Sequence, residues 1–512
     1  MSDLFHLRLD VHKIQEFIFS TPILKYMLGA NSCIGELFSQ DFIALMPPVK
    51  NSFFPKMKVA EEIDSLFQKN ILSSAGGHFE AIFEDMNALE QFVKDAQECI
   101  NLKTPGLEYS FTYRKFDPKM NFKDFLNLPP VPLCLAGNKN EFVDAPFYDI
   151  CQYDGESVGI AKERDNETKK VYGKPKQIMA EQAKRFSKLD SSDAVSQFYK
   201  ELNIDPKHIT TDLEKLTNLG KSLKNNMVAY LKADGNGMGA RFRNKSKELQ
   251  DQPVMEAFMQ VESFWNDNRK RISYLLQRAL EPYILNTLPF ILFMMGGDDL
   301  FLVCTPEIAL KIAEDITQQN DNSPSLSVGI AFTKFTYPIA QAHKIAEMCL
   351  DSAKAAGYAF ADNGRIEPFI DWHVNFDSAY QELKDIRRSS YMLNYCDGDT
   401  EIVEILSKRP YTNPDLTELR EEVTQIAQDL DRDEAQVSNN KIKSYRSTLK
   451  NGYRDVEYMR KMLGINEDME LSRFFVYSKP INNIRIDNSL DKIELIDIYR
   501  TTKREVAQHA EN

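Results

Sequence analysis

Three aspartates at the ends of apolar segments offer the clearest chemistry in this chain of 512 residues. Asp298 and Asp299 follow Gly296-Gly297 between two apolar runs, a pattern that predicts a strand, a tight turn and a second strand. Asp234 ends another apolar run, which begins at Met227. Neighbouring carboxylates repel each other and resist burial as anions unless a cation lies between them. The three acids therefore predict a divalent metal ion and a polymerase-type or cyclase-type nucleotidyltransferase site.

Joining nucleotides requires a hydroxyl group to attack the α-phosphorus of a triphosphate while pyrophosphate departs. Two metal ions about 3.5–4 Å apart activate the hydroxyl and neutralise the leaving group. We predict that Asp234, Asp298 and Asp299 are the catalytic residues and the ligands of Mg²⁺ or Mn²⁺. Because adjacent strand residues point to opposite faces, both hairpin aspartates face one site only if one of them lies on the turn.

Glycines beside the acids predict contacts with nucleotide phosphates. Glycine lets backbone amides approach an anion closely, and the predicted nucleotide-binding residues are Gly235, Asn236, Gly237, Met238, Gly239, Gly296, Gly297 and Lys354. Lys354 lies near the end of an expected helix from Tyr337 to Ala356. There it either reaches the triphosphate or remains solvated and favourable to the helix dipole. Each glycine motif alone is also typical of an ordinary turn, so the prediction depends on their combination.

The acid site belongs to the second of two similar segments, residues 1–116 and 227–335. Each has a strand ending in aspartate, a helical stretch, an Ile-Leu-x-x-x-Gly-Gly hairpin, an amphipathic helix and a strand ending in Lys-Phe. The landmarks recur at similar intervals, which predicts a duplicated β-α-β-β-α-β, ferredoxin-like unit. The amphipathic helices are expected near Ala88–Ile100 and Glu307–Ile316.

The two copies differ where the chemistry is expected. The first copy has Gly77-His78-Phe79-Glu80 where the second has Gly297-Asp298-Asp299-Leu300, although it keeps a strand aspartate, Asp10. A carboxylate, a histidine and a phenylalanine make a poor magnesium site because Mg²⁺ prefers oxygen ligands. We therefore predict that the first copy is structural and the second is catalytic.

These patterns predict an α+β fold with two ferredoxin-like palm domains. The expected parts are a first palm over 1–119, a middle region over 120–226, a second palm over 227–375 and a C-terminal helical domain over 376–512. In the middle region Cys134 and Cys151 have zinc-knuckle-like settings, but a structural zinc needs four ligands and buried free thiols are favoured. The C-terminal helices are expected at Ala379–Arg388, Glu401–Ser407, Leu416–Leu430 and Asp455–Leu463, with a polar, flexible link over 431–450.

The bulk composition narrows the class of protein. A net charge of -13 argues against a protein that grips nucleic acid mainly through its own basic surface, although RNA bound through partner subunits is compatible with it. Seven cysteines without a CxxC pair favour reduced thiols and a cytoplasmic location. The N-terminus shows no signal peptide, and no apolar run approaches the roughly 20 residues of a membrane helix.

The motifs at Asp234–Gly239 and Gly296–Asp299 resemble the large subunit of type III CRISPR effector complexes, the CRISPR polymerase, especially its Cmr-type branch. That family is similar to the GGDEF diguanylate cyclases. Further matching segments are Asp10 to Phe19, Gly29 to Ser32, Ser327 to Ala331, Ala353-Lys354, Asp371 to His373 and Arg409 to Thr412. The resemblance therefore extends over most of the chain up to about residue 412.

The resemblance implies a synthetase that converts ATP into cyclic oligoadenylate, or a related adenylate messenger, when its complex binds target RNA. It also implies other effector subunits as partners, with guide and target RNA bound mainly through the complex. Because the first palm begins within ten residues of the N-terminus, we expect no HD nuclease in this chain. The degraded cysteine motif makes zinc binding in the middle region an unfavoured interpretation.

Two alternatives compete with an RNA-activated synthetase. A standalone GGDEF-like cyclase would use GTP or mixed nucleotides without RNA. A scaffold subunit without turnover would suit the inactive first palm and the helical tail, but not three intact acids. Nucleotide preference separates the first alternative from the main prediction, and pyrophosphate release separates the second.

Overall fold

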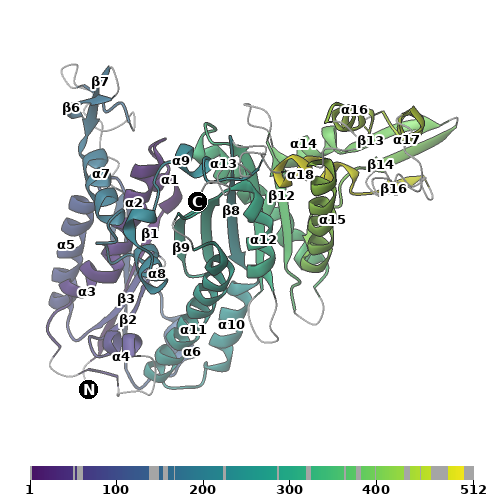
Figure 1. Ribbon diagram of the computed structural model, residues 1–512. Coiled ribbons are helices and arrows are strands. Elements are labelled where there is room, and N and C mark those ends of the chain that lie inside the picture. Colours follow the sequence, from purple (N-terminus) through teal and green to yellow (C-terminus); the bar gives the residue numbers. More distant parts are fainter. Residues whose placement is uncertain are drawn as a thin grey trace. The chain divides into compact units, whose positions relative to one another are not determined.

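Figure 1 shows the fold of the chain as a computed structural model. The structure describes residues 3–49, 52–54, 61–75, 77–137, 149–153, 159–165, 168–222, 226–284, 287–318, 325–361, 365–375, 382–397, 399–431, 439–449, 451–462 and 483–500. The chain divides into two compact units, the first Met1–Asp212 with Gly237–Leu300 and the second Leu213–Asn236 with Phe301–Asn512. The boundary passes through one strand, β10 (Asp299–Cys304), and each unit is described by itself.

The first unit contains a ferredoxin-like sheet. Its strands are β1 (Leu4–His12), β2 (Ile71–Ala75), β3 (His78–Phe83), β4 (Glu108–Phe116) and β5 (Val131–Gly137). The order β2-β3-β1-β4-β5, with antiparallel neighbours, confirms the predicted β-α-β-β-α-β arrangement and adds a fifth strand from the expected middle region. Along β1, Leu7 and Leu9 are buried on one face, while Arg8 and Asp10 lie partly exposed on the other.

Helices cover this sheet and connect it to the rest of the unit. They are α1 (Ile14–Ile18), α2 (Leu24–Glu36), the π-helix η1 (Leu37–Asp41), α3 (Phe42–Leu45), α4 (Glu61–Phe67), α5 (Met86–Lys103), α6 (Phe122–Asn127), α7 (Lys174–Phe186), α8 (Ala194–Glu201), η2 (Pro206–His208), α10 (Met238–Glu248), α11 (Val254–Leu280) and η3 (Glu281–Tyr283). The remaining strands are β6 (Gly159–Asp165), β7 (Thr168–Gly173) and β9 (Phe290–Gly296). The helix expected near 88–100 is α5, so that prediction is confirmed.

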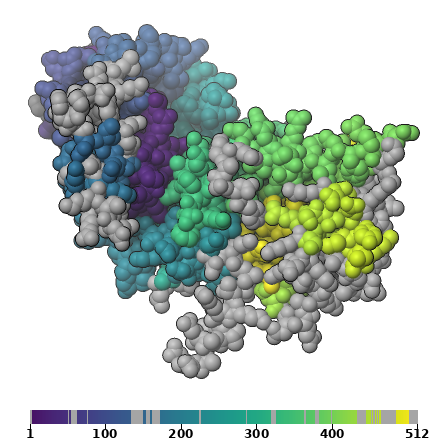
Figure 2. All heavy atoms as spheres, turned by 90° about the horizontal axis from the view of Figure 1, so that it is seen from above, coloured from purple at the N-terminus to yellow at the C-terminus, as the bar shows by residue number. Residues whose placement is uncertain are grey.

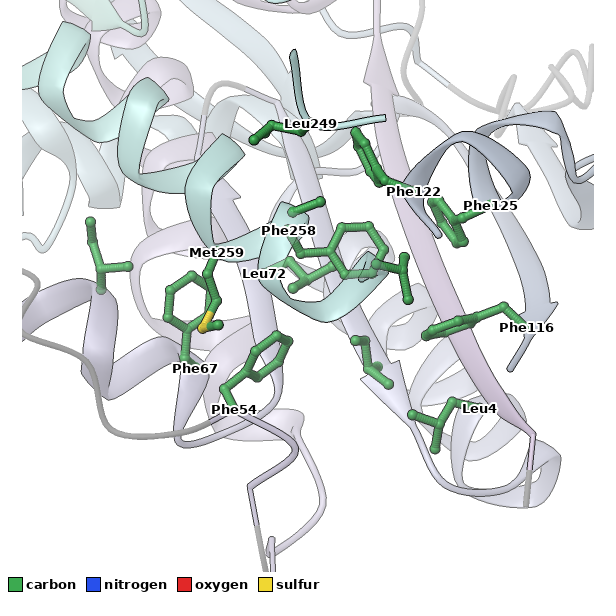
Figure 3. Packing of buried hydrophobic residues seen from close by; sticks show 14 residues of the cluster. Leu4, Phe54, Phe67, Leu72, Phe116, Phe122, Phe125, Leu249, Phe258 and Met259 are labelled. Atoms are coloured by element: carbon green, nitrogen blue, oxygen red, sulfur yellow. The ribbon is translucent and has the colours of Figure 1, made fainter. Parts of the chain in front are cut away.

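An aromatic core joins α11 to the first palm sheet (Figure 3). Phe258 of α11 packs edge-on against Phe125 of α6, with ring centroids 4.9 Å apart, and stacks on His6 of β1. Leu72, Phe116 and Met259 belong to the same cluster. Burying an aromatic or aliphatic side chain of this size contributes about 1.5–3 kcal/mol. The helix α11, the next helix after α10, is therefore anchored on the first palm.

The segment around Cys151 is held by a lysine among aromatic rings. Cys151 is a buried free thiol. The ammonium group of the buried Lys176 lies 4.5–5.0 Å from three ring centroids, those of Tyr26, Tyr153 and Tyr172. Cation–π contacts of this kind tie α2, the Cys151 segment and β7 together. The side chain of Cys134 and residues 154–158 lie outside the described part of the chain.

The second palm sheet has the strand order β15-β12-β11-β8-β10-β9. Its further strands are β8 (Met227–Gly235), β11 (Leu326–Lys334), β12 (Phe369–Val374) and β15 (Tyr411–Thr412). The run β11-β8-β10-β9 repeats the order β4-β1-β3-β2 of the first palm, which confirms the predicted duplication. All but one residue of β8 are buried, as a central strand requires.

The helices of the second unit include α9 (Leu213–Thr217), α12 (Pro306–Thr317) and α13 (Ile339–Ala359), and the last two confirm the helices expected near 307–316 and 337–356. Gly329 of β11 lets α13 pack closely on the sheet. A Cβ atom there would lie 2.1 Å from the carbonyl oxygen of Ala346 and 2.3 Å from the amide nitrogen of Leu350. The small residue therefore fixes how near α13 lies to the strands.

The C-terminal part contains a second, smaller sheet as well as helices. Its elements are α14 (Leu383–Ser390), β13 (Met392–Asp397), β14 (Thr400–Ile405), α15 (Asn413–Asp431), α16 (Asn439–Leu449), α17 (Tyr453–Met462), β16 (Ile484–Ile486) and α18 (Ser489–Tyr499). The helices expected at Leu416–Leu430 and Asp455–Leu463 are α15 and α17. The helix expected at Ala379–Arg388 begins only at Leu383, after residues that lie outside the described part. Figure 2 shows α16 and α17, in yellow-green, at the surface.

Two local predictions in this part are wrong. The helix expected at Glu401–Ser407 is strand β14, because most of its residues, Thr400, Ile402, Val403 and Ile405, are β-branched and it pairs antiparallel with β13. The polar link expected over 431–450 contains α16, which buries Ile442, Tyr445 and Leu449 at helical spacing. Among the described residues, no helix combines the length and apolar character needed to cross a bilayer.

Candidate active site

The Gly-Gly-Asp-Asp segment forms a tight turn between β9 and β10. Gly297 has φ +63°, in the left-handed region that favours glycine, and a Cβ atom on Gly296 would meet nothing within 4 Å. Asp298 lies on the turn and Asp299 begins β10. The local condition for both carboxylates to serve one site, that one of them leaves the strand, is therefore met.

Asp298 has no described cation to neutralise it. Burial raises the pKa of its carboxyl group above the ordinary value, and the opposing contribution is a hydrogen bond from its own backbone amide. Among the described residues no lysine, arginine or histidine contributes to that pKa. A half-buried carboxylate in such surroundings favours either a proton or an added cation.

A cavity of about 450 Å³ adjoins the turn within the first unit. Gly296, Gly297 and Asp299 form one side of it. Apolar side chains line much of the rest, including Ile34 and Phe38 near the end of α2 and Ile272 of α11, with polar groups such as Asn31 and Gln197 between them. A space of this size and lining is typical of small-molecule sites.

The second unit places Asp234 and Lys354 together. Asp234 lies near the end of β8, and its Oδ2 atom accepts a hydrogen bond from Nζ of Lys354 on α13. Both side chains are about one-quarter exposed, at 24% and 23%. Burial lowers the pKa of Lys354, and the nearby Lys232 lowers it further. Lys354 thus contacts Asp234, while its contact with a triphosphate remains a prediction.

Lys232 was not predicted from the sequence. It lies two residues before Asp234 on β8, so both side chains point to the same face of the strand. Its buried Nζ atom donates to Oε1 of Glu347 on α13 at 2.9 Å. Glu347 and Lys354 are separated by two helical turns and share a face. The period-two position of Lys232 was the available signal.

The glycine-rich loop divides into an anchored residue and a helix start. The backbone N–H of Asn236 donates to the carbonyl oxygen of Ser325 at 2.8 Å, and its Nδ2 atom donates to Ser325 Oγ at 2.9 Å. The backbone N–H of Asn236 therefore already donates a hydrogen bond within the fold and is not free to bind a phosphate. Gly237, with φ +68°, caps α10, and the N–H groups of Met238 and Gly239 belong to the first turn, which lacks acceptors within the helix.

The predicted site residues fall into two groups. Asp234, Gly235, Asn236 and Lys354 belong to the second unit, whereas Gly237, Met238, Gly239, Gly296, Gly297, Asp298 and Asp299 belong to the first. Each group is described by itself. The convergence of Asp234 with the hairpin acids remains a prediction.

The acids have the donor chemistry that a magnesium ion needs, but they do not form a complete cage. Among the described residues, no group of three or more histidine, cysteine or acidic side chains is arranged to hold a metal ion. Mg²⁺ at nucleotide sites is commonly held by one or two carboxylates together with substrate phosphates and water. The unneutralised Asp298 beside Asp299 fits such a shared arrangement.

Comparison with known proteins identifies this part of the chain. Residues 227–359 match the family model of Cas10/Cmr2, second palm domain. The chain is similar in fold to a solved structure of the Csm1-Csm4 cassette in complex with cA3, at 13% identity and a TM-score of 0.51, over 98% of this chain and 70% of the other. A second structure, the cassette with one ATP, matches at 12% identity and a TM-score of 0.50, again over 98% and 70%. No curated protein sequence matches the chain.

Proposed function

Because residues 227–359 form a second palm domain of the Cas10/Cmr2 type, we propose that this chain is the nucleotide-joining large subunit of a type III CRISPR complex. Its substrate in this proposal is ATP and its product a cyclic oligoadenylate or a related adenylate messenger. Target RNA bound to the assembled complex would activate it. The similar solved cassettes contain cA3 or ATP, which supports an adenylate as the ligand class.

The observation that carries the proposal is the Gly-Gly-Asp-Asp turn with its unneutralised acid. Asp298 lies on the turn, burial raises its pKa, and no described cation compensates. A fold that needed this turn only for structure would gain stability from a neutral residue there, since an uncompensated half-buried carboxylate is unfavourable. The retained acid is therefore better explained by a ligand that supplies positive charge.

Each residue has a role in the proposal. Asp234, Asp298 and Asp299 would hold Mg²⁺ or Mn²⁺, which when bound activates the attacking hydroxyl and offsets the charge of the leaving pyrophosphate. The N–H groups of Met238 and Gly239 at the start of α10 would bind phosphate oxygens. Lys354 holds Asp234 before the nucleotide binds and would share its charge with the triphosphate afterwards.

The cavity beside the turn suits the apolar part of a nucleotide. Its walls of Ile34, Phe38 and Ile272 would accept a base, and Asp299 stands at its rim. Exclusion of water by such walls strengthens electrostatic interactions with the phosphates. Other effector subunits, comparable to Csm4 in the similar cassette, are the proposed partners that bring RNA to the chain.

Mass spectrometry of the reaction products tests the proposal. The assembled complex would be incubated with ATP, Mg²⁺ and target RNA, and in parallel with GTP or without RNA. An adenylate oligomer that requires RNA and disappears in the Asp298→Ala, Asp299→Ala variant is the expected result. Product without RNA would favour a standalone cyclase, and absence of pyrophosphate release under every condition would favour a scaffold.

A further inference from the structure

Three arginines gather around the first turns of α10, and no carboxylate among the described residues is paired with them. Arg241 and Arg243 lie on α10, and Arg271 lies on α11. The Nη1 atom of Arg243 folds back toward the helix start and lies 3.5 Å from where a Cβ atom on Gly239 would be. Long helical side chains lean toward the N-terminus in this way. The guanidinium group of Arg243 is thus beside the glycine-rich loop.

Packing between the two helices holds the other two arginines. Figure 1 shows α10 beside α11, and the ring of Phe242 stacks on Trp265 with centroids 5.8 Å apart. Burial lowers the pKa of Arg241, and the charge of Arg271 lowers it further, so the two guanidinium groups act on each other. Burial also lowers the pKa of Arg271. The helix pair therefore holds two like charges near each other in partly desolvated positions.

In the described part of the chain, one polar atom of each of these two arginines has no hydrogen-bond partner. The Nε atoms of Arg241 and Arg271 are buried, and no hydrogen-bond acceptor in the described chain contacts them. No described carboxylate contributes to the pKa of either group. A buried donor without an acceptor costs free energy, and more so when it carries charge.

Two fully buried arginines of the second unit are arranged differently. Arg409 binds Asp491 and Glu494, and Arg485 binds Glu404. Those arginines are neutralised inside the fold, as structural arginines are expected to be. The contrast indicates that the arginines at α10 can bind a negative charge that the described residues do not provide.

We propose that Arg241, Arg243 and Arg271 bind the β- and γ-phosphates of the donor nucleoside triphosphate and retain the pyrophosphate formed from it. The inference rests on the proposed function, because it identifies the donor as a triphosphate. Their position favours this ligand: Arg243 adjoins Gly239, whose N–H belongs to the anion-binding first turn of α10. Guanidinium groups also match phosphate oxygens in geometry.

The arginines act on the leaving group in this scheme. The attacking hydroxyl oxygen forms a bond to the α-phosphorus and releases its proton to water. The bond from that phosphorus to the bridging oxygen breaks, and its electron pair stays on the pyrophosphate. The new negative charge thus develops next to the three guanidinium groups, which stabilise it.

Isothermal titration with inorganic pyrophosphate, AMP and an ATP analogue tests the site. The Arg241→Met and Arg271→Met variants should bind pyrophosphate and the ATP analogue about 10-fold or more weakly, because each loses a charge-assisted contact. AMP, which lacks both distal phosphates, should change by less than about twofold. The Lys247→Met variant, an exposed lysine of α10, removes the same charge and should bind all three ligands as the parent does.

A structural role for the arginines makes different predictions. Removing one of two repelling charges should leave the melting temperature equal or higher, whereas loss of a stabilising contact would lower it. Equal pyrophosphate affinity in the arginine variants and the parent would overturn the inference, as would a loss confined to RNA binding. Weakened pyrophosphate binding in a chain that joins no nucleotides would instead retain the arginine site and reject the proposed function.

Discussion

The two palms place acidic residues on the same framework but neutralise them in opposite ways. Both turns have a glycine at positive φ, Gly77 at +85° and Gly297 at +63°. In the first palm, Nε of Arg8 donates to both carboxylate oxygens of Asp10, at 2.8 and 3.0 Å, and Nδ1 of His78 lies 3.4 Å away. Burial raises the pKa of Asp10, but hydrogen bonds from His78 and Arg8 outweigh it and hold the pKa well below its usual range.

The second palm offers no such compensation to Asp298. Where the first palm has His78 directly after the turn glycine, the second has this acid, and burial raises its pKa. The comparison shows that the first palm neutralises its strand aspartate with cationic side chains of its own. The other pairs Asp234 with Lys354 but leaves Asp298 without a described cation, as the proposed metal site requires.

The largest effect is expected from removing the acids of the second turn. The Asp298→Ala, Asp299→Ala variant should lose about 10³-fold or more in adenylate formation, because several kcal/mol of transition-state stabilisation disappear. Product quantified by mass spectrometry per folded complex measures this. Asp10→Ala in the first palm is the matched control and should change the rate by less than about twofold. An equal loss in both variants would end the distinction between the palms.

A smaller effect on activity is expected from Lys354→Met. Loss of one charge-assisted contact should lower kcat/KM for ATP by about 10–100-fold, and Asp234 would lose its partner. Steady-state kinetics over a range of ATP concentrations provides the measurement. Lys344→Met, at an exposed position of the same helix, is the control. Unchanged kinetics in Lys354→Met would remove this lysine from the site.

Substitution of the two turn glycines should change the free energy of unfolding by different amounts. Gly297→Ala is expected to lower the free energy of unfolding by about 1–2 kcal/mol, since a Cβ atom is unfavourable at its positive φ. Gly296→Ala should be almost neutral, because nothing lies within 4 Å of the added carbon. Chemical denaturation of both variants checks the difference. Equal costs would contradict the described turn geometry.

The smallest effect concerns acid stability of the first palm. Because the pKa of Asp10 is depressed in the fold, its stabilising contribution is complete above its ordinary value of 3.8 and is lost as the pH falls below it. Arg8 is 43% exposed, so the contribution is reduced by solvent to about 1 kcal/mol. Asp10→Asn should therefore lose less stability than the parent between about pH 4 and pH 2. The free energy of unfolding of both proteins would be measured by denaturant titration at each pH. The same pH dependence in the variant and the parent would refute this prediction.

Local patterns predicted the parts of the site that depend on neighbouring residues. Paired glycines and the repeated landmarks were enough to predict both palms and the hairpin turn beside the two aspartates, but not which aspartate lies on the turn. Helical spacing was misjudged at β14, where a short apolar pattern fits both helix and strand and the pairing with β13 decides between them. The resemblance to type III large subunits is confirmed for the second palm and for the fold.

Contacts between distant segments could not be predicted. The pairing of Lys232 with Glu347 depends on how α13 lies on β8. Gly329 permits this close packing, but a glycine in the sequence does not by itself predict it. The arginines at α10 could not be singled out from the sequence, because it does not show that Arg271 of the next helix lies near Arg241. Charged side chains of this kind can be recognised as candidate binding residues only when the fold shows which of them have no described partner.

Binding of Mn²⁺ in the presence of a non-hydrolysable ATP analogue tests the central claim most directly. Electron paramagnetic resonance would count bound Mn²⁺ in the assembled complex and in its Asp298→Asn, Asp299→Asn variant. Saturable binding in the parent, weakened at least about 10-fold in the variant, is the predicted result, since the carboxylates are the ligands. Equal Mn²⁺ affinity in both proteins would contradict the assignment of these acids to a metal-dependent nucleotide site.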